Sequence, residues 1–156
     1  DVHRELADQY KVPFYFVPSD RKSRRENEIL RLVKDSTDFL VLARYMLILS
    51  GSFIKNYSRD IINIHHGFLP SFKGANPYQQ ALERGVKVIG ATSHFVTEKL
   101  DCGPIITQEV SEVSHKDDLS DLLRKGRNLE NRALCDALAS YVQHRVIRFK
   151  NKTVIF

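Results

Sequence analysis

The sequence has 156 residues, enough for one domain with one hydrophobic core, and its 42% hydrophobic and 28% charged residues are ordinary for a soluble globular protein. No apolar run approaches the roughly 18 residues of a membrane span, and internal repeats are absent, which excludes a membrane-spanning chain and a solenoid. The net charge of +5 comes from scattered basic residues without interleaved aromatic residues. We interpret them as a solvated surface that can attract an anionic small substrate, and we predict no nucleic-acid or membrane partner.

Hydrophobic periodicity predicts helices and strands in alternation. In chain order the expected elements are a helix over 1–10, a strand over 12–17, a helix over 23–34, a strand over 38–43, a short helix over 50–57, a strand over 60–64, a helix over 77–84, strands over 87–96 and 104–113, a long helix over 119–144, and a strand, turn and strand over 145–156. This order predicts an α/β fold with a Rossmann-like, mostly parallel sheet flanked by helices. Up to Val96 the spacing fits βαβ units.

Local residue preferences set the expected boundaries in the first third of the chain. Asp1 is a possible N-cap of the first helix, and Pro13 favours an edge position for the strand over 12–17. Ser23 is the expected N-cap of the second helix, with Glu26 as its capping-box partner three residues later. The continuous apolar run over 38–43 is typical of a parallel strand that is covered on both faces.

Further boundaries are expected in the second half of the chain. Pro77 suits the first turn of a helix that Gly85 ends. Either Ser114 or Asp117 is the expected N-cap of the long helix. Gly126 is expected to kink this helix or to split it in two.

The region from Ile61 to Gly103 carries the candidate chemistry. Asn63 and His65 are two residues apart at the end of an apolar run, so their side chains share one face of the expected strand. Asp101 follows the next apolar run. Since ligands bind outside the carboxyl ends of strands in open α/β sheets, the three side chains are expected to meet there. An amide donor, an imidazole and a carboxylate together suit attack on a carbonyl by water or an amine.

Other interpretations of these residues stay open from pattern alone. Asn63 can satisfy loop amides, His65 and His66 can be an ordinary pair of loop histidines, and Asp101 can form a turn before Gly103. A zinc site that includes His94 is a further alternative. However, adjacent histidines at a strand exit point to opposite sides, so we predict no metal. Cys102 and Cys135 lie 33 positions apart without a CxxC motif, which indicates a reducing compartment.

Two stretches, NIHHGFLPSFKGANPYQQA from Asn63 and GATSHFVTEKLDCGPII from Gly90, resemble the catalytic domain of formyltransferases that use 10-formyltetrahydrofolate. The signatures are Asn63-x-His65, Leu69-Pro70, Gly74, and His94 followed seven residues later by Asp101. Within that superfamily the chain most resembles the formyltetrahydrofolate deformylases, and the resemblance runs from about Pro13 to Phe156. Its discriminating features are the paired His65-His66, LARYM at 42–46, Pro77-Tyr78 and the C-terminal NKTVIF.

The resemblance implies hydrolysis of 10-formyltetrahydrofolate to formate and tetrahydrofolate, in one-carbon metabolism and purine biosynthesis. Asn63 is then expected to hydrogen-bond the formyl oxygen, His65 to shuttle the proton, and Asp101 to hold His65 and position or activate the water. The folate is the substrate, and no cofactor is implied. The implied substrate-binding residues are Met46, Ile48, Leu49, His66, Gly74, His94, Val96, Thr97 and Leu100.

The same resemblance implies how the chain is organised. Residues 1–156 are expected to form a single catalytic domain, N-terminally truncated, because family members have a strand, a helix and a strand ahead of the segment that matches Asp1. The regulatory ACT-type domain that deformylases usually carry is not present in the sequence. Loss of central strands is expected to expose their neighbours. A homo-oligomer is expected, in the cytoplasm for a bacterial chain or the mitochondrial matrix for a plant chain.

Two alternatives remain beside hydrolysis. One is formyl transfer to an amine acceptor, either glycinamide ribonucleotide or methionyl-tRNA. In glycinamide ribonucleotide transformylases the residue that matches Leu47 is typically Arg, so Leu47 weakens that alternative. The other is a catalytically inert fragment that binds folate or oligomerises.

Overall fold

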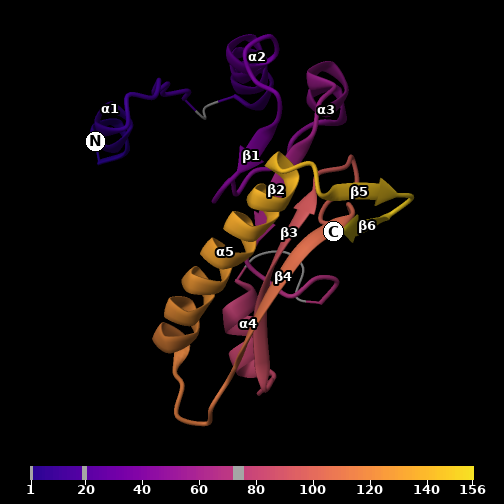
Figure 1. The fold of residues 1–156 in the computed structure, drawn as a ribbon. Helices are drawn as coiled ribbons and strands as arrows, with labels where there is room; N and C mark the ends of the chain where they lie inside the picture. The colour runs from indigo at the N-terminus through magenta and orange to yellow at the C-terminus, as the bar shows by residue number, and fades with distance from the viewer. Residues whose placement is uncertain (1, 19–20, 72–75) are drawn as a thin grey trace.

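The computed structural model describes residues 2–18, 21–71 and 76–156. A four-stranded sheet in the order β1-β2-β3-β4 forms its centre, and a separate hairpin pairs β5 with β6 (Figure 1). The elements are α1 (Val2–Gln9), α2 (Lys22–Val33), β1 (Leu40–Leu42), α3 (Gly51–Tyr57), β2 (Ile61–His65), α4 (Pro77–Glu83), β3 (Val88–Phe95), β4 (Ile105–Glu112), α5 (Leu119–Val142), β5 (Val146–Phe149) and β6 (Lys152–Ile155). The predicted α/β class and nearly all the predicted elements are confirmed.

The direction of β3 differs from the expectation of βαβ units and a mostly parallel sheet. Only β1 and β2 are parallel, whereas β3 runs antiparallel to β2, and β4 runs antiparallel to β3. The chain therefore leaves β2, forms α4, and enters β3 at the same end of the sheet. Spacing alone does not distinguish this path from a crossover, because both contain a helix between two apolar strands. The described sheet is consequently mixed.

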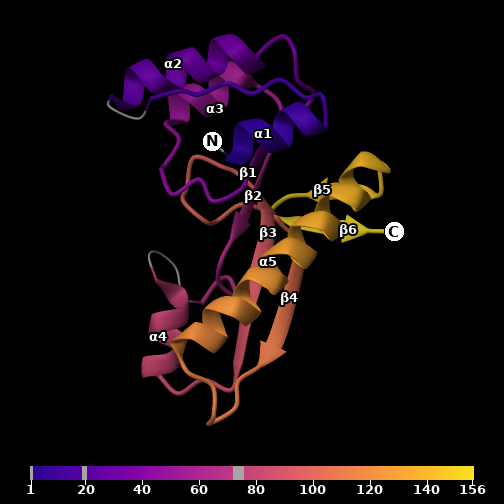
Figure 2. The same cartoon turned by 90° about the vertical axis from the view of Figure 1, so that its left-hand side faces the viewer.

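α5 covers one face of this sheet along most of its length (Figure 2). Leu122, Leu129 and Ala133 of α5 pack in one cluster with Ile64 of β2 and Ala91 of β3. Because side chains alternate across a strand, the neighbours of Ile64 in β2 point to the other face. This alternation leaves the face opposite α5 for the polar side chains of the central strands.

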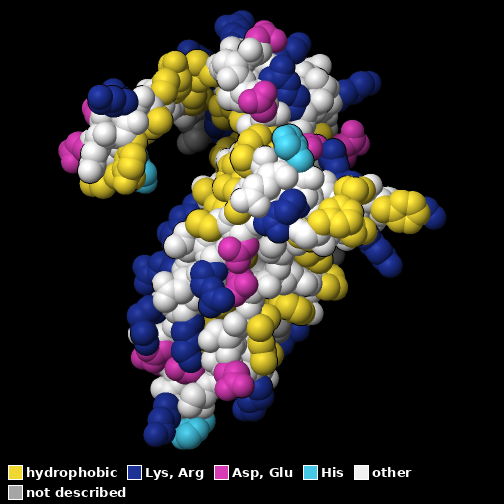
Figure 3. Space-filling view, in the orientation of Figure 1, with side chains coloured by type: hydrophobic (Ala, Val, Ile, Leu, Met, Phe, Trp, Pro, Cys, Tyr) yellow, Lys and Arg dark blue, Asp and Glu magenta, His cyan; other side chains and the backbone are white. Residues whose placement is uncertain are grey.

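Two segments near the N-terminus differ from their predictions. Residues 12–17 form no strand in the described part of the chain, and Tyr15 and Phe16 are exposed. Figure 3 shows hydrophobic side chains, in yellow, on the surface of the stretch between α1 and α2. Pro13 lacks an amide donor, and no strand among the described residues pairs with this segment. An aromatic and β-branched sequence is therefore insufficient by itself to form a strand. In β1, Val41 is 37% exposed, so this strand is not covered on both faces as predicted. Asp1, the expected cap of α1, lies outside the described residues.

The expected capping box at the start of α2 is wrong. The N-cap is Arg21, which makes no side-chain cap hydrogen bond. Glu26 is buried and instead accepts hydrogen bonds from the backbone amide of Ser50 at 2.9 Å and from its hydroxyl at 2.5 Å. Since Ser50 is itself the N-cap of α3, the carboxylate joins two helices that are distant in sequence. A long-range partner thus replaces the expected local one.

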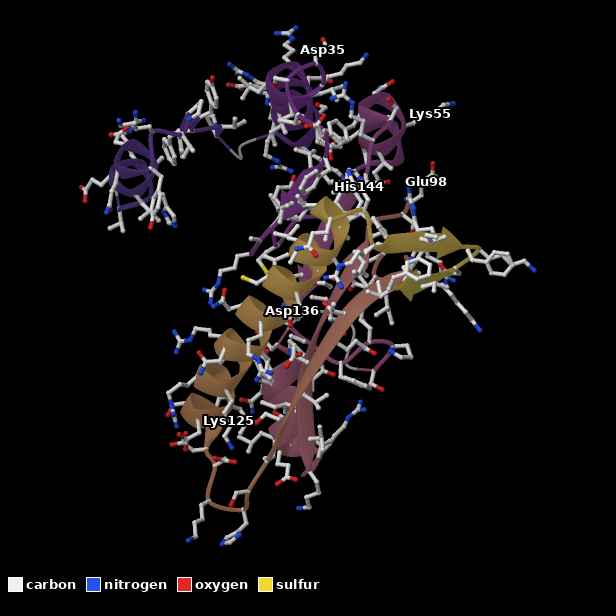
Figure 4. All side chains as sticks on the ribbon, viewed as in Figure 1. Asp35, Lys55, Glu98, Lys125, Asp136 and His144 are labelled. Atoms are coloured by element: carbon white, nitrogen blue, oxygen red, sulfur yellow. The ribbon has the colours of Figure 1, made fainter. Side chains whose placement is uncertain are left out.

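α5 also begins differently from the expectation and does not break. Its N-cap is Asp118, which forms a capping box with Asp121, so neither Ser114 nor Asp117 has the expected role. The helix is continuous through Gly126, where a methyl group would lie 2.2 Å from Cζ of Tyr78 on α4. Gly126 is therefore required for close approach of a side chain and not for a kink. Lys125 and Asp136 mark the course of α5, and His144 follows its end (Figure 4).

A buried threonine joins β3 to the loop that follows β2. The Thr92 hydroxyl donates to the carbonyl oxygen of Gly67 at 2.9 Å and accepts from the amide of Leu69 at 3.1 Å and from Nε2 of Gln108 at 3.1 Å. Gln108 also donates to the carbonyl oxygen of Leu69 at 2.9 Å. These bonds hold the loop directly after His65 and His66 against the sheet.

We expect Thr92→Val to lower the free energy of unfolding by about 2 kcal/mol, because the methyl group leaves buried donors and acceptors unsatisfied. Thr92→Ser keeps the hydroxyl and is the matched control. Urea denaturation of the three proteins checks this prediction. Equal stability of Thr92→Val and the unmodified chain would show that the network contributes nothing.

Candidate active site

Neighbouring strands bring four polar side chains onto the face of the sheet opposite α5. Asn63 of β2 lies directly across from His94 of β3, and His65 lies across from Thr92. Asn63 Nδ2 is 3.2 Å from His94 Nε2. Cross-strand partners on one face have their Cβ atoms about 5 Å apart, which explains how residues 31 positions apart come into contact.

The loop after β3 brings Asp101 to this face by an unexpected route. Because β3 is antiparallel, its carboxyl end lies beside the start of β2, where the amide of Val96 donates to the carbonyl oxygen of Ile61 at 2.7 Å. The site lies at the carboxyl ends of the parallel strands β1 and β2, as predicted, but β3 does not end there. The loop instead folds back, with Asp101 in the left-handed region at φ 50°. Aspartate tolerates this conformation better than most residues.

Asp101 lies between two imidazole rings. Its Oδ2 is 3.5 Å from Nδ1 of His65, and its Oδ1 is 3.8 Å from Nε2 of His94. The side chains of His65, His94 and Asp101 are 5%, 3% and 9% exposed. Asn63, His65 and Asp101 are thus brought together as the sequence predicts, with His94 beside them.

His94 is held as a neutral ring. Its Nδ1 donates to the carbonyl oxygen of Phe95 at 2.9 Å, which leaves Nε2 as the acceptor for the Asn63 amide. Burial lowers the pKa of His94, and this effect outweighs the opposing influences of the Phe95 carbonyl and the Asp101 carboxylate. One amide hydrogen of Asn63 is therefore directed to His94, so the orientation of the amide is fixed.

The neutral state of His94 predicts how stability responds to acid. The folded-state pKa lies below the ordinary value of 6.5, so the unfolded chain binds this proton first as the pH falls. Stability is unaffected above the ordinary value and decreases below it, by up to about 1.4 kcal/mol per pH unit, until the folded-state pKa is reached. We expect His94→Gln to lose less unfolding free energy than the unmodified chain between about pH 7 and pH 5. Urea titrations check this, and an equal loss in both proteins would contradict it.

A cavity of about 1020 Å³ adjoins these side chains. Gly74 lies outside the described residues. All the other residues predicted to bind substrate line the cavity: Met46, Ile48, Leu49, His66, His94, Val96, Thr97 and Leu100. Asn63, His65 and Asp101 also line it. β1 pairs with β2 only as far as Asn63, so the end of β2 remains open to this space. The volume is in the upper range for sites that hold a drug-sized molecule.

Sequence reasoning missed one side of this cavity. α4 and α5 contribute Pro77, Tyr78, Gln79, Leu119, Leu123, Arg127 and Glu130. From sequence, Tyr78 stands out only in the family resemblance, and no residue of α5 is predicted to line a site. The signal that could have found them is Gly126, which stands in an otherwise regular helix because α4 approaches it closely.

This arrangement suits chemistry at a carbonyl carbon. The Asn63 amide is fixed by His94 and is suited to donate to an oxygen that becomes negative. His65 can carry a proton, and the Asp101 carboxylate can accept one from a nucleophile. Among the described residues, no group of three or more His, Cys, Asp or Glu side chains has a geometry that could hold a metal ion. None of the described helices is both long and apolar enough to cross a bilayer.

Comparisons with known proteins show which proteins this chain is similar to. A formyl transferase family model matches residues 3–138. Formyltetrahydrofolate deformylase 1, mitochondrial, of Arabidopsis thaliana is 55% identical over 152 residues, which are 97% of this chain and 47% of that protein. The crystal structure of a formyltetrahydrofolate deformylase from Pseudomonas syringae matches with a TM-score of 0.93 at 47% identity, over 98% of this chain and 52% of that one.

Transferases share the fold as well. The glycinamide ribonucleotide transformylase 1 of Symbiobacterium toebii matches with a TM-score of 0.88 at 31% identity, over 97% of this chain and 74% of that one. This chain spans about half the length of the deformylases that it matches. The resemblance to the deformylases is confirmed, because the sequence identity of 55% and 47% extends over nearly the whole chain. With the family model covering most of its residues, this chain belongs to the formyl transferase family.

Proposed function

We propose that this chain carries the catalytic site for hydrolysis of 10-formyltetrahydrofolate to formate and tetrahydrofolate. The observation that carries the proposal is the cluster of Asn63, His65 and Asp101 beside one large cavity, in a chain 55% identical to a deformylase. The cavity is lined by apolar side chains on its β1 side, which suits an aromatic pterin ring. The apolar groups are Leu42, Met46, Ile48, Leu49, Val96 and Leu100.

In the proposed reaction, water attacks the formyl carbon and Asp101 accepts its proton. The amide of Asn63 donates to the formyl oxygen as negative charge develops there. His65, beside the Asp101 carboxylate, delivers a proton to N10 of the folate as the carbon–nitrogen bond breaks. Formate and tetrahydrofolate then leave. None of these steps requires a covalent bond to the protein or a cofactor.

Formate release from 10-formyltetrahydrofolate without any amine present tests the proposal. A hydrolase releases formate in proportion to the tetrahydrofolate that forms. A transferase produces tetrahydrofolate only when an acceptor such as glycinamide ribonucleotide is added, which would overturn the proposal. Folate binding without either product would indicate an inert fragment. Leu47, which lines the cavity where transformylases typically have Arg, supports the hydrolase.

The relatives also bear on the location of this chain, and we propose its assembly as well. The Arabidopsis thaliana relative is named as mitochondrial, so we propose the mitochondrial matrix if the chain is from a plant and the cytoplasm if it is bacterial. A homo-oligomer that acts on a small folate substrate completes the proposal. Sedimentation equilibrium tests the assembly.

A further inference from the structure

Tyr78 occupies a defined place on the side of the cavity formed by α4 and α5. It is 5% exposed, and its ring fits against α5 where Gly126 has no side chain. One turn farther along α5, Glu130 Oε1 accepts a hydrogen bond from the Tyr78 hydroxyl at 3.2 Å. Burial and the Glu130 carboxylate raise the pKa of Tyr78, so the phenol remains a donor. Contacts from α5 therefore hold both the ring and the hydroxyl.

The cavity has two sides that differ in chemistry. The side near β1 and α3 is mainly apolar, whereas the side near α4 and α5 contains Gln79, Arg127 and Glu130. Figures 1 and 2 show α3 and α4 toward opposite ends of the sheet. His66 and Tyr78 face each other at the second side, with ring centroids 6.3 Å apart.

A second substrate can approach the formyl carbon only from space that the folate does not fill. If the pterin occupies the apolar side, as proposed above, this space is the side near α4 and α5. Water needs little room there, but an amine brings its whole carbon skeleton. A ring held by Gly126 and Glu130 cannot move aside easily, since it would lose both contacts.

We propose that Tyr78 determines the choice of nucleophile by forming a fixed wall that limits the room for an amine acceptor on this side of the cavity. This inference rests on the proposed hydrolysis and names the residue that makes water the nucleophile. In hydrolysis the water oxygen bonds to the formyl carbon, the bond to N10 breaks, one proton of the water passes to N10, and formate leaves with release of the other proton. In transfer the amine nitrogen bonds to the formyl carbon, the bond to N10 breaks, and a proton of the amine passes to N10. Both reactions use the same catalytic cluster, and Tyr78 affects only which nucleophile reaches it.

The test measures the ratio of transfer to hydrolysis in the presence of glycinamide, a small primary amine. N-formylglycinamide is quantified by mass spectrometry and formate by an enzymatic assay, with 10-formyltetrahydrofolate as donor and a reaction without protein as blank. We expect the ratio to rise at least tenfold in Tyr78→Ala. Tyr78→Phe keeps the ring and is the matched control, with a ratio close to that of the unmodified chain. If thermal melting shows that Tyr78→Ala is not folded, Tyr78→Leu is measured in its place.

The outcomes separate this inference from the function on which it rests. Normal formate release by the unmodified chain, with the same ratio in all folded variants, overturns the role of Tyr78 and leaves the hydrolase intact. Efficient transfer to glycinamide by the unmodified chain also overturns it. If the unmodified chain releases no formate, the proposed function fails, and the inference fails with it.

Discussion

Asp101→Asn is expected to reduce formate release from 10-formyltetrahydrofolate by roughly 100- to 10,000-fold, the range for loss of a general acid or base. The carboxylate lies 3.5 Å from Nδ1 of His65 and 3.8 Å from Nε2 of His94. An amide at this position has nearly the same shape but cannot accept a proton from water. We expect KM for the folate to change little, because the apolar side of the cavity is untouched.

The matched control is Asp136→Asn, the same substitution at an exposed position on α5 outside the cavity (Figure 4). This control is expected to keep full turnover. Steady-state kinetics of the two variants check the prediction, and thermal melting shows whether each is folded. Turnover by folded Asp101→Asn at the rate of the control would remove Asp101 from the mechanism.

Gly103→Ala is expected to lower the free energy of unfolding by about 3 kcal/mol, at the upper end for overpacking a buried site. A methyl group on Gly103 would lie 1.8 Å from the carbonyl oxygen of Phe95 and 2.8 Å from its carbonyl carbon. Both are backbone atoms, so relief requires movement of β3 or of the loop that carries Asp101. The variant is therefore expected to lose turnover as well as stability.

Gly51→Ala is the control for this substitution. Its methyl group would meet only the Glu98 side chain, at 3.4 Å, and Gly51 begins α3, where alanine is favourable. Urea denaturation and formate release, measured on both variants, check the prediction. A Gly103→Ala chain with unchanged stability and turnover would show that the loop adapts freely.

The local sequence predicted most elements because periodicity and end signals act over a few residues. The short helix over 50–57 and Pro77 at the first turn of α4 are confirmed, and so is the hairpin of β5 and β6. The failures involve distant partners. Glu26 was expected to cap its own helix, but it accepts hydrogen bonds from Ser50, 24 positions away. The segment over 12–17 has a strand pattern, but no other described segment pairs with it.

The candidate site was likewise predictable where it depends on local sequence and unpredictable where it depends on distant contacts. Asn63 and His65 share a face because a strand alternates with a period of two, which is evident from sequence. Their contact with Asp101 was expected for the wrong geometric reason, since a parallel β3 was assumed. His94 as the fixed partner of Asn63 depends on antiparallel register, which places the two residues opposite each other. This strand register cannot be predicted from the residues near either position in the sequence.

By itself, the sequence determined the α/β class, nearly every element, the family resemblance and the residue types of the site, because each depends on neighbours along the chain. Only the tertiary structure decided the direction of β3, the path by which Asp101 returns to the sheet, and the side of the cavity built from α4 and α5. These features depend on contacts between residues far apart in sequence. Such contacts form through packing of the whole chain, and a short stretch of residues does not specify them.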